Sequence, residues 1–338
     1  MPLRDVVVIG ASAGGIEALT ALVSALPGDF ASTLFVVLHI PPHSPSSLPA
    51  ILSRSGPLPA VHPEDGEPIQ PGRIYVAPPD KHLLIEHDRV VVKRGPKENR
   101  ARPSVDALFR SAAYVYRSRV IGIVLSGTLD DGTSGLWSVK RLGGLAIVQQ
   151  PEEAAFPDMP CNALEQVEVD HTLGVHDMGA LLCGLVKQSV TEQPHVPPEI
   201  LKRLELEVQI ATDDDAFERG IMEWGELTPF TCPECHGVLV RLYEGKLARF
   251  RCHTGHAFTP NALLAEVTEA VEHQLWQAMR GLEECTMLLK HMGEHFQQAG
   301  QNDIAALFFT KARENGERAR VVHESLPRHE QLSGDLRR

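Results

Sequence analysis

The sequence lacks the segments that would insert it into a membrane or direct its export. No apolar run approaches the ~20 residues that a membrane-spanning helix needs. The first residues, MPLRDVVVIG, do not show the charged, apolar and cleavable regions of a secretory signal in series. We therefore expect a cytoplasmic protein without direct membrane insertion.

An excess of basic charge is also lacking, because the formal net charge of the 338 residues is −12. Proteins that bind nucleic acid normally carry a basic face, so this charge argues against a nucleic-acid partner. Hydrophobic residues make up 43% of the chain and charged residues 22%, which is typical of a soluble globular protein with ample material for a core. The length favours two domains.

The first half of the chain alternates short apolar runs with helical patterns. This order predicts an α/β fold with a doubly wound, mostly parallel sheet, which we expect to span residues 1–186. The apolar runs expected as buried strands are 6–9, 34–38, 74–77, 120–125 and 145–148. Helices are expected at 16–26 and 104–116, and a hairpin on the edge of the sheet at 83–93.

The composition changes near Lys187, where a polar segment with several prolines begins. Further on, two amphipathic stripes separated by Gly300 predict an α-helical hairpin. The expected parts are a linker and acidic segment (187–228, with an aspartate run at 213–215), a zinc-ribbon-like module (229–259), the helical hairpin (260–327) and a polar tail (328–338).

The loop after the first expected strand lacks the second glycine of the dinucleotide-binding fingerprint G-x-G-x-x-G. Ser12 stands at that position in the segment GASAGG, and no acidic residue ends the second strand, where ribose recognition would need one. The loop does match G-x-S-x-G, a tight strand-to-helix turn that holds a serine hydroxyl clear of the backbone. A turn of small residues without any chemistry is the alternative explanation of this pattern.

Two further strand ends carry residues that suit a serine nucleophile. His39 ends the second strand, and Asp130 and Asp131 lie in a glycine-rich loop after the fourth. Sites in open parallel sheets form at the carboxyl ends of the strands, so we expect these side chains near Ser12. A serine nucleophile needs a base and a carboxylate that orients the base. A structural histidine or a helix-capping aspartate explains each residue singly, but not their convergence.

Five ordered motifs between residues 3 and 186 resemble those of the CheB-type chemotaxis methylesterases, the protein-glutamate methylesterases. The motifs are GASAGG, LHIPPH, EDGEPIQPGRIYVAPPDKHL, NRARPSVD and LSGTLDDGTSGL. The resemblance implies a doubly wound domain with Ser12 as nucleophile, His39 as base and Asp131 as orienting acid. The backbone amides of Ala13 and, by the resemblance, Thr128 are the expected oxyanion donors.

The reaction implied by the resemblance is hydrolysis of glutamate γ-methyl esters on the cytoplasmic helices of chemoreceptor-like proteins, with release of methanol and without a catalytic cofactor. Related members also deamidate glutamine side chains. The usual family protein carries an N-terminal receiver domain, whereas this chain starts at the catalytic strand. We therefore expect regulation to be absent or supplied by a separate response regulator. Arg100 and Arg102 are candidates for docking an acidic helix, and a solvated loop is the alternative.

The segment 230–258 has two pairs of metal-binding residue types around a hairpin pattern, Cys232-x2-Cys235 and Cys252-His253-x2-His256. Structural Zn²⁺ takes four nitrogen or sulfur ligands in a tetrahedron, which such pairs supply. The three cysteines are the expected ligands, with His256 as the fourth and His253 or His236 as alternatives. Because protein fills all four positions, the zinc is expected to be structural. Free thiols in a reducing cytosol are the alternative.

The methylesterase is the preferred hypothesis, with two alternatives. One is a non-catalytic signalling adaptor that uses the methylesterase-like domain and the zinc and helical tail to bind proteins. The other is a nucleotide-binding protein, against which Ser12 argues. In each case the C-terminal helices are expected to dock a partner or to self-associate.

Overall fold

The computed structural model describes residues 2–190, 194–212 and 216–335. The chain divides into two compact units, Met1–Leu263 and Leu264–Arg338. The aspartate run expected at 213–215 lies outside the described residues.

A seven-stranded parallel sheet forms the centre of the first unit, in the order β3-β4-β2-β1-β7-β8-β9. The strands are β1 (Val6–Ala11), β2 (Thr33–Leu38), β3 (Ala60–Val61), β4 (Ile74–Val76), β7 (Val120–Val124), β8 (Leu145–Gln149) and β9 (His171–Leu173). The strand order reverses at β1 and β7. A crevice therefore opens at the carboxyl ends of these two central strands.

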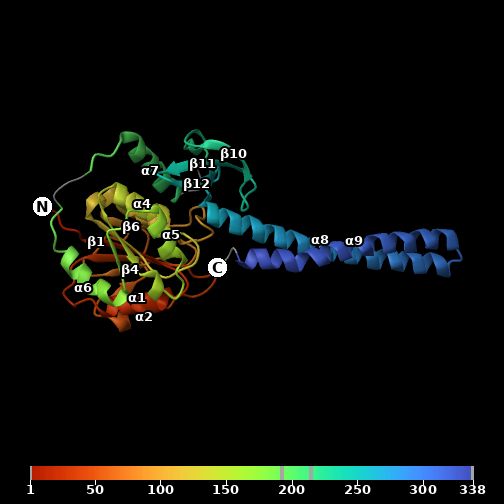
Figure 1. Cartoon of the computed structure of the whole chain (residues 1–338), viewed down its shortest axis with the longest axis horizontal. Coiled ribbons are helices and arrows are strands. Elements are labelled where there is room, and N and C mark those ends of the chain that lie inside the picture. Colours follow the sequence, from red (N-terminus) through yellow and green to blue (C-terminus); the bar gives the residue numbers. More distant parts are fainter. Residues whose placement is uncertain (1, 191–193, 213–215, 336–338) are drawn as a thin grey trace. The chain divides into compact units, whose positions relative to one another are not determined.

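Helices cover both faces of this sheet, as expected for a doubly wound fold (Figure 1). One face packs against α1 (Gly15–Ser24), α2 (Leu48–Ser55) and α6 (Val175–Leu185), and the other against α3 (Val105–Tyr116), α4 (Thr133–Arg141) and α5 (Asp158–Gln166). In β1, Val6 and Val8 face the second set of helices, while Val7 and Ile9 face the first. Burial on both faces explains why the strands are continuously apolar.

The hairpin expected on the edge of the main sheet is a separate two-stranded sheet, formed by β5 (His82–Glu86) and β6 (Arg89–Lys93). The expected placement was wrong because the hairpin packs against α3 instead of pairing with an edge strand of the main sheet, and both of its faces are buried. Leu83 and Ile85 join the core around α3, and Leu84 packs with Ala107 on the opposite side. The backbone of Ile85 also donates a hydrogen bond to Ser111 Oγ on α3, at 3.1 Å.

The segment expected as a linker contains a helix, α7 (Pro198–Ile210), that packs within the first unit. Its Leu204 is fully buried in the same hydrophobic core as the apolar residues of α3. Ile210 packs with Leu242 of the next module. That module is a four-stranded antiparallel sheet, which we call the ribbon: β10 (Glu226–Thr231), β11 (Val238–Glu244), β12 (Leu247–Cys252) and β13 (Ala257–Phe258).

A buried cluster of ion pairs joins the ribbon to the α/β layers. Arg249 Nη1 lies 2.6 Å from Glu207 and 2.8 Å from Glu244, and Arg251 Nη2 lies 2.8 Å from Glu98. Glu98 also pairs with Arg110 of α3 at 3.1 Å. Six members of the cluster are fully buried, three carboxylates and three guanidiniums: Glu98, Glu207, Glu244, Arg110, Arg249 and Arg251. The partly exposed Arg203 adds a fourth guanidinium, 3.9 Å from Glu207 and 3.7 Å from Glu244.

Two helices form the second unit, as expected: α8 (Pro260–Gln298), which begins in the first unit, and α9 (Asn302–Asp335) (Figure 1). Gly300 adopts a φ of 73° in the turn between them, which a glycine tolerates without strain. Phe296 and Phe308 stack next to the turn, with ring centroids 5.3 Å apart. Within the described residues, no helix combines the length and apolarity needed to cross a membrane.

Candidate active site

The nucleophile candidate Ser12 and the base candidate His39 leave neighbouring strands at the same level. Ala11 of β1 pairs with Leu38 of β2, so the next residue of each strand enters the crevice side by side. The amide of His39 donates to the carbonyl of Ala11 at 3.1 Å, and the amide of Ser12 donates to the carbonyl of Ser126 after β7 at 2.9 Å. Neighbouring strands lie ~4.8 Å apart, so the backbones of Ser12 and His39 are neighbours in the crevice.

Glycines clear the space around Ser12. Gly14 adopts a φ of 70°, and a Cβ on it would come within 2.7 Å of Ala155 Cβ and Ser126 Oγ. A Cβ on Gly127 would lie 2.8 Å from Ser12 Cβ and 2.1 Å from Met159 Sδ. The loops after β1 and β7 therefore touch at the serine, and side chains larger than hydrogen do not fit between them.

Replacing Gly127 with alanine should displace Ser12, because the new methyl group would overlap Ser12 Cβ. We expect labelling of Ser12 by a fluorophosphonate probe to slow by at least about tenfold, since displacements of ~1 Å cost large factors in rate. Gly184→Ala is the matched control, because a Cβ at this exposed position of α6 meets no atom within 4 Å. Equal labelling of the two variants would contradict the expected contact.

The His39 imidazole and the Asp131 carboxylate form a hydrogen-bonded pair, with Nε2 2.8 Å from Oδ2. Asp131 is buried, and its two oxygens accept four further hydrogen bonds, from Asn99 Nδ2 (2.9 Å), Ser104 Oγ (2.9 Å) and the amides of Val105 (2.7 Å) and Asp106 (3.3 Å). The two amides belong to the first turn of α3, where a helix favours an anion.

These hydrogen-bond donors keep the Asp131 carboxyl ionised. Burial by itself would raise the pKa of this carboxyl, but the hydrogen bond and the electrostatic attraction of the His39 ring, followed by the bonds from Asn99 and Val105, hold the pKa below its usual value. Asp131 is therefore an anion that can stabilise a positively charged imidazole. Within the described residues, His39 Nδ1 has no hydrogen-bond partner, so this second ring nitrogen is available for a reacting proton.

Three residues of this site were not predicted from the sequence: Asn99, Ser104 and Asp106. All three lie in the motif NRARPSVD, in which only the arginines had been singled out. Asp106 is buried and accepts hydrogen bonds from the amides of Gly132 (3.0 Å) and Gly135 (2.6 Å). Burial and the neighbouring Asp131 carboxylate raise the pKa of Asp106 well above its usual value.

The two docking candidates differ in their surroundings. The guanidinium of Arg102 is 2.7 Å from Asp80 Oδ1 and donates to the carbonyl of Gly95 at 2.7 Å. Arg100 is half-buried in the same loop, with a φ of 70°. Arg102 thus stabilises its own loop, and the role of both residues in substrate docking stays a prediction.

The two amides expected to bind an oxyanion are those of Ala13 and Thr128. Within the described residues, neither donates to a protein acceptor, whereas the amide of Gly127 is taken by the carbonyl of Phe156 at 3.0 Å. The amides of Ala13 and Thr128 flank Ser12 from the loops after β1 and β7. Amides without a protein partner at this point can donate to a substrate oxygen.

The ribbon brings four metal-ligating side chains together at one end: Cys232, Cys235, Cys252 and His256. Their ligand atoms all lie within 4.8 Å of one another, with Cys235 Sγ 3.6 Å from Cys252 Sγ and His256 Nδ1 3.6 Å from Cys252 Sγ. Zn–S bonds of ~2.3 Å in a tetrahedron separate the sulfurs by about 3.8 Å, so the set fits one zinc ion. The group does not include the alternatives His253 and His236.

The thiols of this group also favour a cation. The hydrogen bond from Cys232 lowers the pKa of the Cys252 thiol, while the same bond raises that of Cys232. Two sulfurs that share one proton in this way carry a negative charge between them. A metal ion in place of the proton would neutralise that charge.

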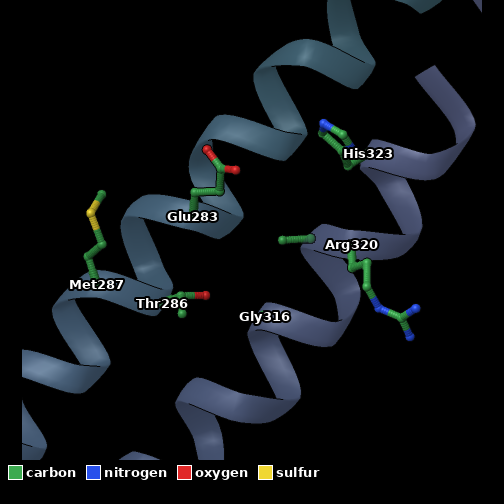
Figure 2. Close-up of a pocket in the computed structure, with 7 residues that line it drawn as sticks. Glu283, Thr286, Met287, Gly316, Arg320 and His323 are labelled. Atoms are coloured by element: carbon green, nitrogen blue, oxygen red, sulfur yellow. The ribbon is translucent and has the colours of Figure 1, made fainter. Parts of the chain in front are cut away.

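The helical hairpin carries a groove of about 470 Å³ between α8 and α9 (Figure 2). Its lining includes Glu283 and Met287 from α8, and Gly316, Arg320 and His323 from α9. Arg320 forms an exposed ion pair with Glu324 at 3.1 Å. None of the site residues predicted from the sequence lines this groove.

Comparison with known proteins gives matches to the α/β half of the chain. A family model described as CheB methylesterase matches residues 7–182, just over half of the sequence. A protein of Leptospira interrogans, named putative protein-glutamate methylesterase/protein-glutamine glutaminase, is 37% identical over 190 residues, covering 56% of this chain and 98% of the relative. A Thermotoga maritima protein-glutamate methylesterase/protein-glutamine glutaminase is 35% identical over 185 residues, covering 54% of each chain.

A solved structure shows the same fold. The crystal structure of the Thermotoga maritima CheB methylesterase catalytic domain has a TM-score of 0.52 and 34% sequence identity, covering 54% of this chain and 98% of that one. The ribbon and the helical hairpin lie outside the residues that the family model matches.

Proposed function

The chain belongs to the CheB methylesterase family, and on this basis we propose that it is a protein-glutamate methylesterase with a Ser-His-Asp triad. It hydrolyses γ-methyl esters of glutamates on cytoplasmic helices of chemoreceptor-like proteins and releases methanol. The observation that carries this proposal is the convergence of Ser12, His39 and the buried Asp131 at the carboxyl ends of β1, β2 and β7.

In the proposed reaction, Ser12 Oγ attacks the ester carbonyl while His39 Nδ1 takes the serine proton. The carboxylate of Asp131, 2.8 Å from Nε2, stabilises the imidazolium that forms. The amides of Ala13 and Thr128 donate to the oxyanion of the tetrahedral intermediate. His39 then protonates the departing methoxide, and water hydrolyses the acyl-enzyme by the same route in reverse. A glutamine side chain would react in the same way with loss of ammonia, so deamidation is a second proposed activity.

Methanol release from a receptor fragment with methylated glutamates tests this proposal directly. The wild-type protein should release methanol, and a fluorophosphonate probe should label Ser12. An adaptor that only binds the receptor would retain the fragment but release no methanol and take up no probe. That result would contradict the methylesterase and favour the adaptor.

The ribbon is proposed to hold a structural zinc ion through Cys232, Cys235, Cys252 and His256. Support comes from the donor types and from their distances, all within 4.8 Å. Four protein ligands leave no open position for a substrate, so the ion would stabilise the ribbon and take no part in the ester chemistry.

Metal analysis of the purified protein should find about one equivalent of zinc per chain. Cys235→Ser should reduce the zinc content well below one equivalent, because it removes one of the four ligands. Cys285→Ser is the matched control, since Cys285 is an exposed cysteine of α8. Wild-type protein purified without chelator that contains no zinc would refute the metal site.

A further inference from the structure

The ribbon contacts the catalytic site through a short stretch of backbone next to the metal-ligating end. β13 pairs with β12 on one side, and its Ala257 bonds to the segment 97–99 on the other. The amide of Asn99 donates to the carbonyl of Ala257 at 2.8 Å, and the amide of Ala257 donates to the carbonyl of Lys97 at 3.2 Å. The residue after β13, Thr259, is therefore held beside the loop that supplies Asn99 to Asp131.

The hydroxyl, the amide and the carbonyl of Thr259 all form hydrogen bonds at this junction. Its side chain is fully buried, and its hydroxyl donates to Asp130 Oδ1 at 2.6 Å. The same hydroxyl accepts from the amide of Ala262 at 3.1 Å, which makes Thr259 the N-cap of α8. Burial raises the pKa of Asp130 to about 6, and the hydrogen bond from Thr259 opposes that rise.

The backbone amide of Thr259 fixes the orientation of the Asn99 side chain. It donates to Asn99 Oδ1 at 2.9 Å, so the oxygen end of the amide group must face the ribbon. The Asn99 nitrogen then faces the two carboxylates, at 2.9 Å from Asp131 Oδ1 and 2.7 Å from Asp106 Oδ2. A flipped amide would place an oxygen against the anionic Asp131, which is electrostatically unfavourable.

We propose that Thr259 is a positioning residue for Asp131, the acid that orients His39, so that the end of the ribbon completes the active site of the enzyme. Thr259 acts in two ways: its hydroxyl anchors Asp130, the residue before Asp131, and its amide orients Asn99 toward Asp131. This proposal rests on the proposed methylesterase activity. It assigns a role in the reaction to a segment outside the residues that the family model matches.

Three variants test the role of the hydroxyl. Thr259→Val keeps the shape and removes the donor, and it should lower kcat for methyl-ester hydrolysis about 10- to 100-fold with KM within about twofold. Thr259→Ser restores the hydroxyl and should keep kcat within about threefold of wild type. Thr228→Val is the matched control, because Thr228 is a ribbon threonine whose hydroxyl donates to the carbonyl of Leu239 at 2.7 Å. It should leave kcat near wild type.

Three results would overturn the proposal. Thr259→Val could retain wild-type kcat, or the kcat of Thr259→Ser or of Thr228→Val could fall as far as that of Thr259→Val. A second measurement needs no turnover: the ¹H NMR signal of the His39 ring proton bonded to Asp131. This signal should persist in wild type and Thr228→Val, and shift or vanish in Thr259→Val. If wild type releases no methanol, the proposed function fails, and this signal alone decides the positioning role. An unchanged signal in Thr259→Val then overturns it.

Discussion

Replacing Ser12 with alanine should lower kcat for methanol release by about 10⁴- to 10⁶-fold. The hydroxyl is the proposed nucleophile, and loss of the nucleophile from a Ser-His-Asp triad leaves only what substrate binding and the oxyanion donors contribute. The fold should be unaffected, because the Ser12 contacts that tie the loops together are made by its backbone. Methanol release under single-turnover conditions, together with a thermal unfolding scan, would measure both effects.

Ser126→Ala is a demanding control for this experiment. The Ser126 hydroxyl lies in the neighbouring loop and donates to the carbonyl of Ala13 at 2.8 Å, so its loss disturbs the same turn without removing the nucleophile. We expect it to retain much more activity than Ser12→Ala. A Ser12→Ala protein that still releases methanol at a rate near wild type would rule out Ser12 as the nucleophile.

Replacing Arg249 with methionine should destabilise the first unit by about 3–5 kcal/mol, the range found when one partner of a buried ion pair is removed. Arg249 is fully buried and contacts Glu98, Glu207 and Glu244. Without it, the three carboxylates would keep Arg110, Arg251 and the partly exposed Arg203, and Glu244 would lose its shorter ion pair. Urea unfolding followed by tryptophan fluorescence would measure the loss.

Arg241→Met provides the contrast within the same ribbon. Arg241 pairs with Glu226 at 2.8 Å, but both side chains are exposed, and an exposed pair contributes little because water and salt screen it. We therefore expect no clear change in the urea midpoint. Equal losses for Arg249→Met and Arg241→Met would mean that burial of the charge cluster does not contribute to stability.

Local patterns in the sequence were enough to predict the central architecture. Continuous apolar runs predicted the buried parallel strands. Consecutive residues such as Val7 and Val8 point to opposite faces of the sheet, and both faces are buried. The strand ends at His39 and before Asp131 predicted that these two side chains lie close together, as their 2.8 Å contact shows, whereas Ser12 as the nucleophile stays a prediction. These inferences needed only chain order and the geometry of a parallel sheet.

The parts that were missed depend on contacts between distant segments. Nothing near Asn99 in the sequence indicates that its partner is Thr259, 160 residues later. Nothing in the sequence marks the arginines of β12 as buried, because their burial depends on distant carboxylates such as Glu98 and Glu207. The hairpin at 83–93 was placed on the sheet's edge because its pairing was visible locally, whereas its packing against α3 was not.

The buried charge cluster also sets an order of events during synthesis. Glu98 and its partner Arg251 are separated by 153 residues. A ribosome that adds ~5–20 residues per second completes that stretch in roughly 8–30 s. Until β12 is synthesised, Glu98 has Arg110 as a partner but lacks the guanidiniums of Arg249 and Arg251. This holds even after every strand of the parallel sheet has been synthesised. The buried charge cluster of the nascent chain is therefore completed only when the ribbon has left the ribosome.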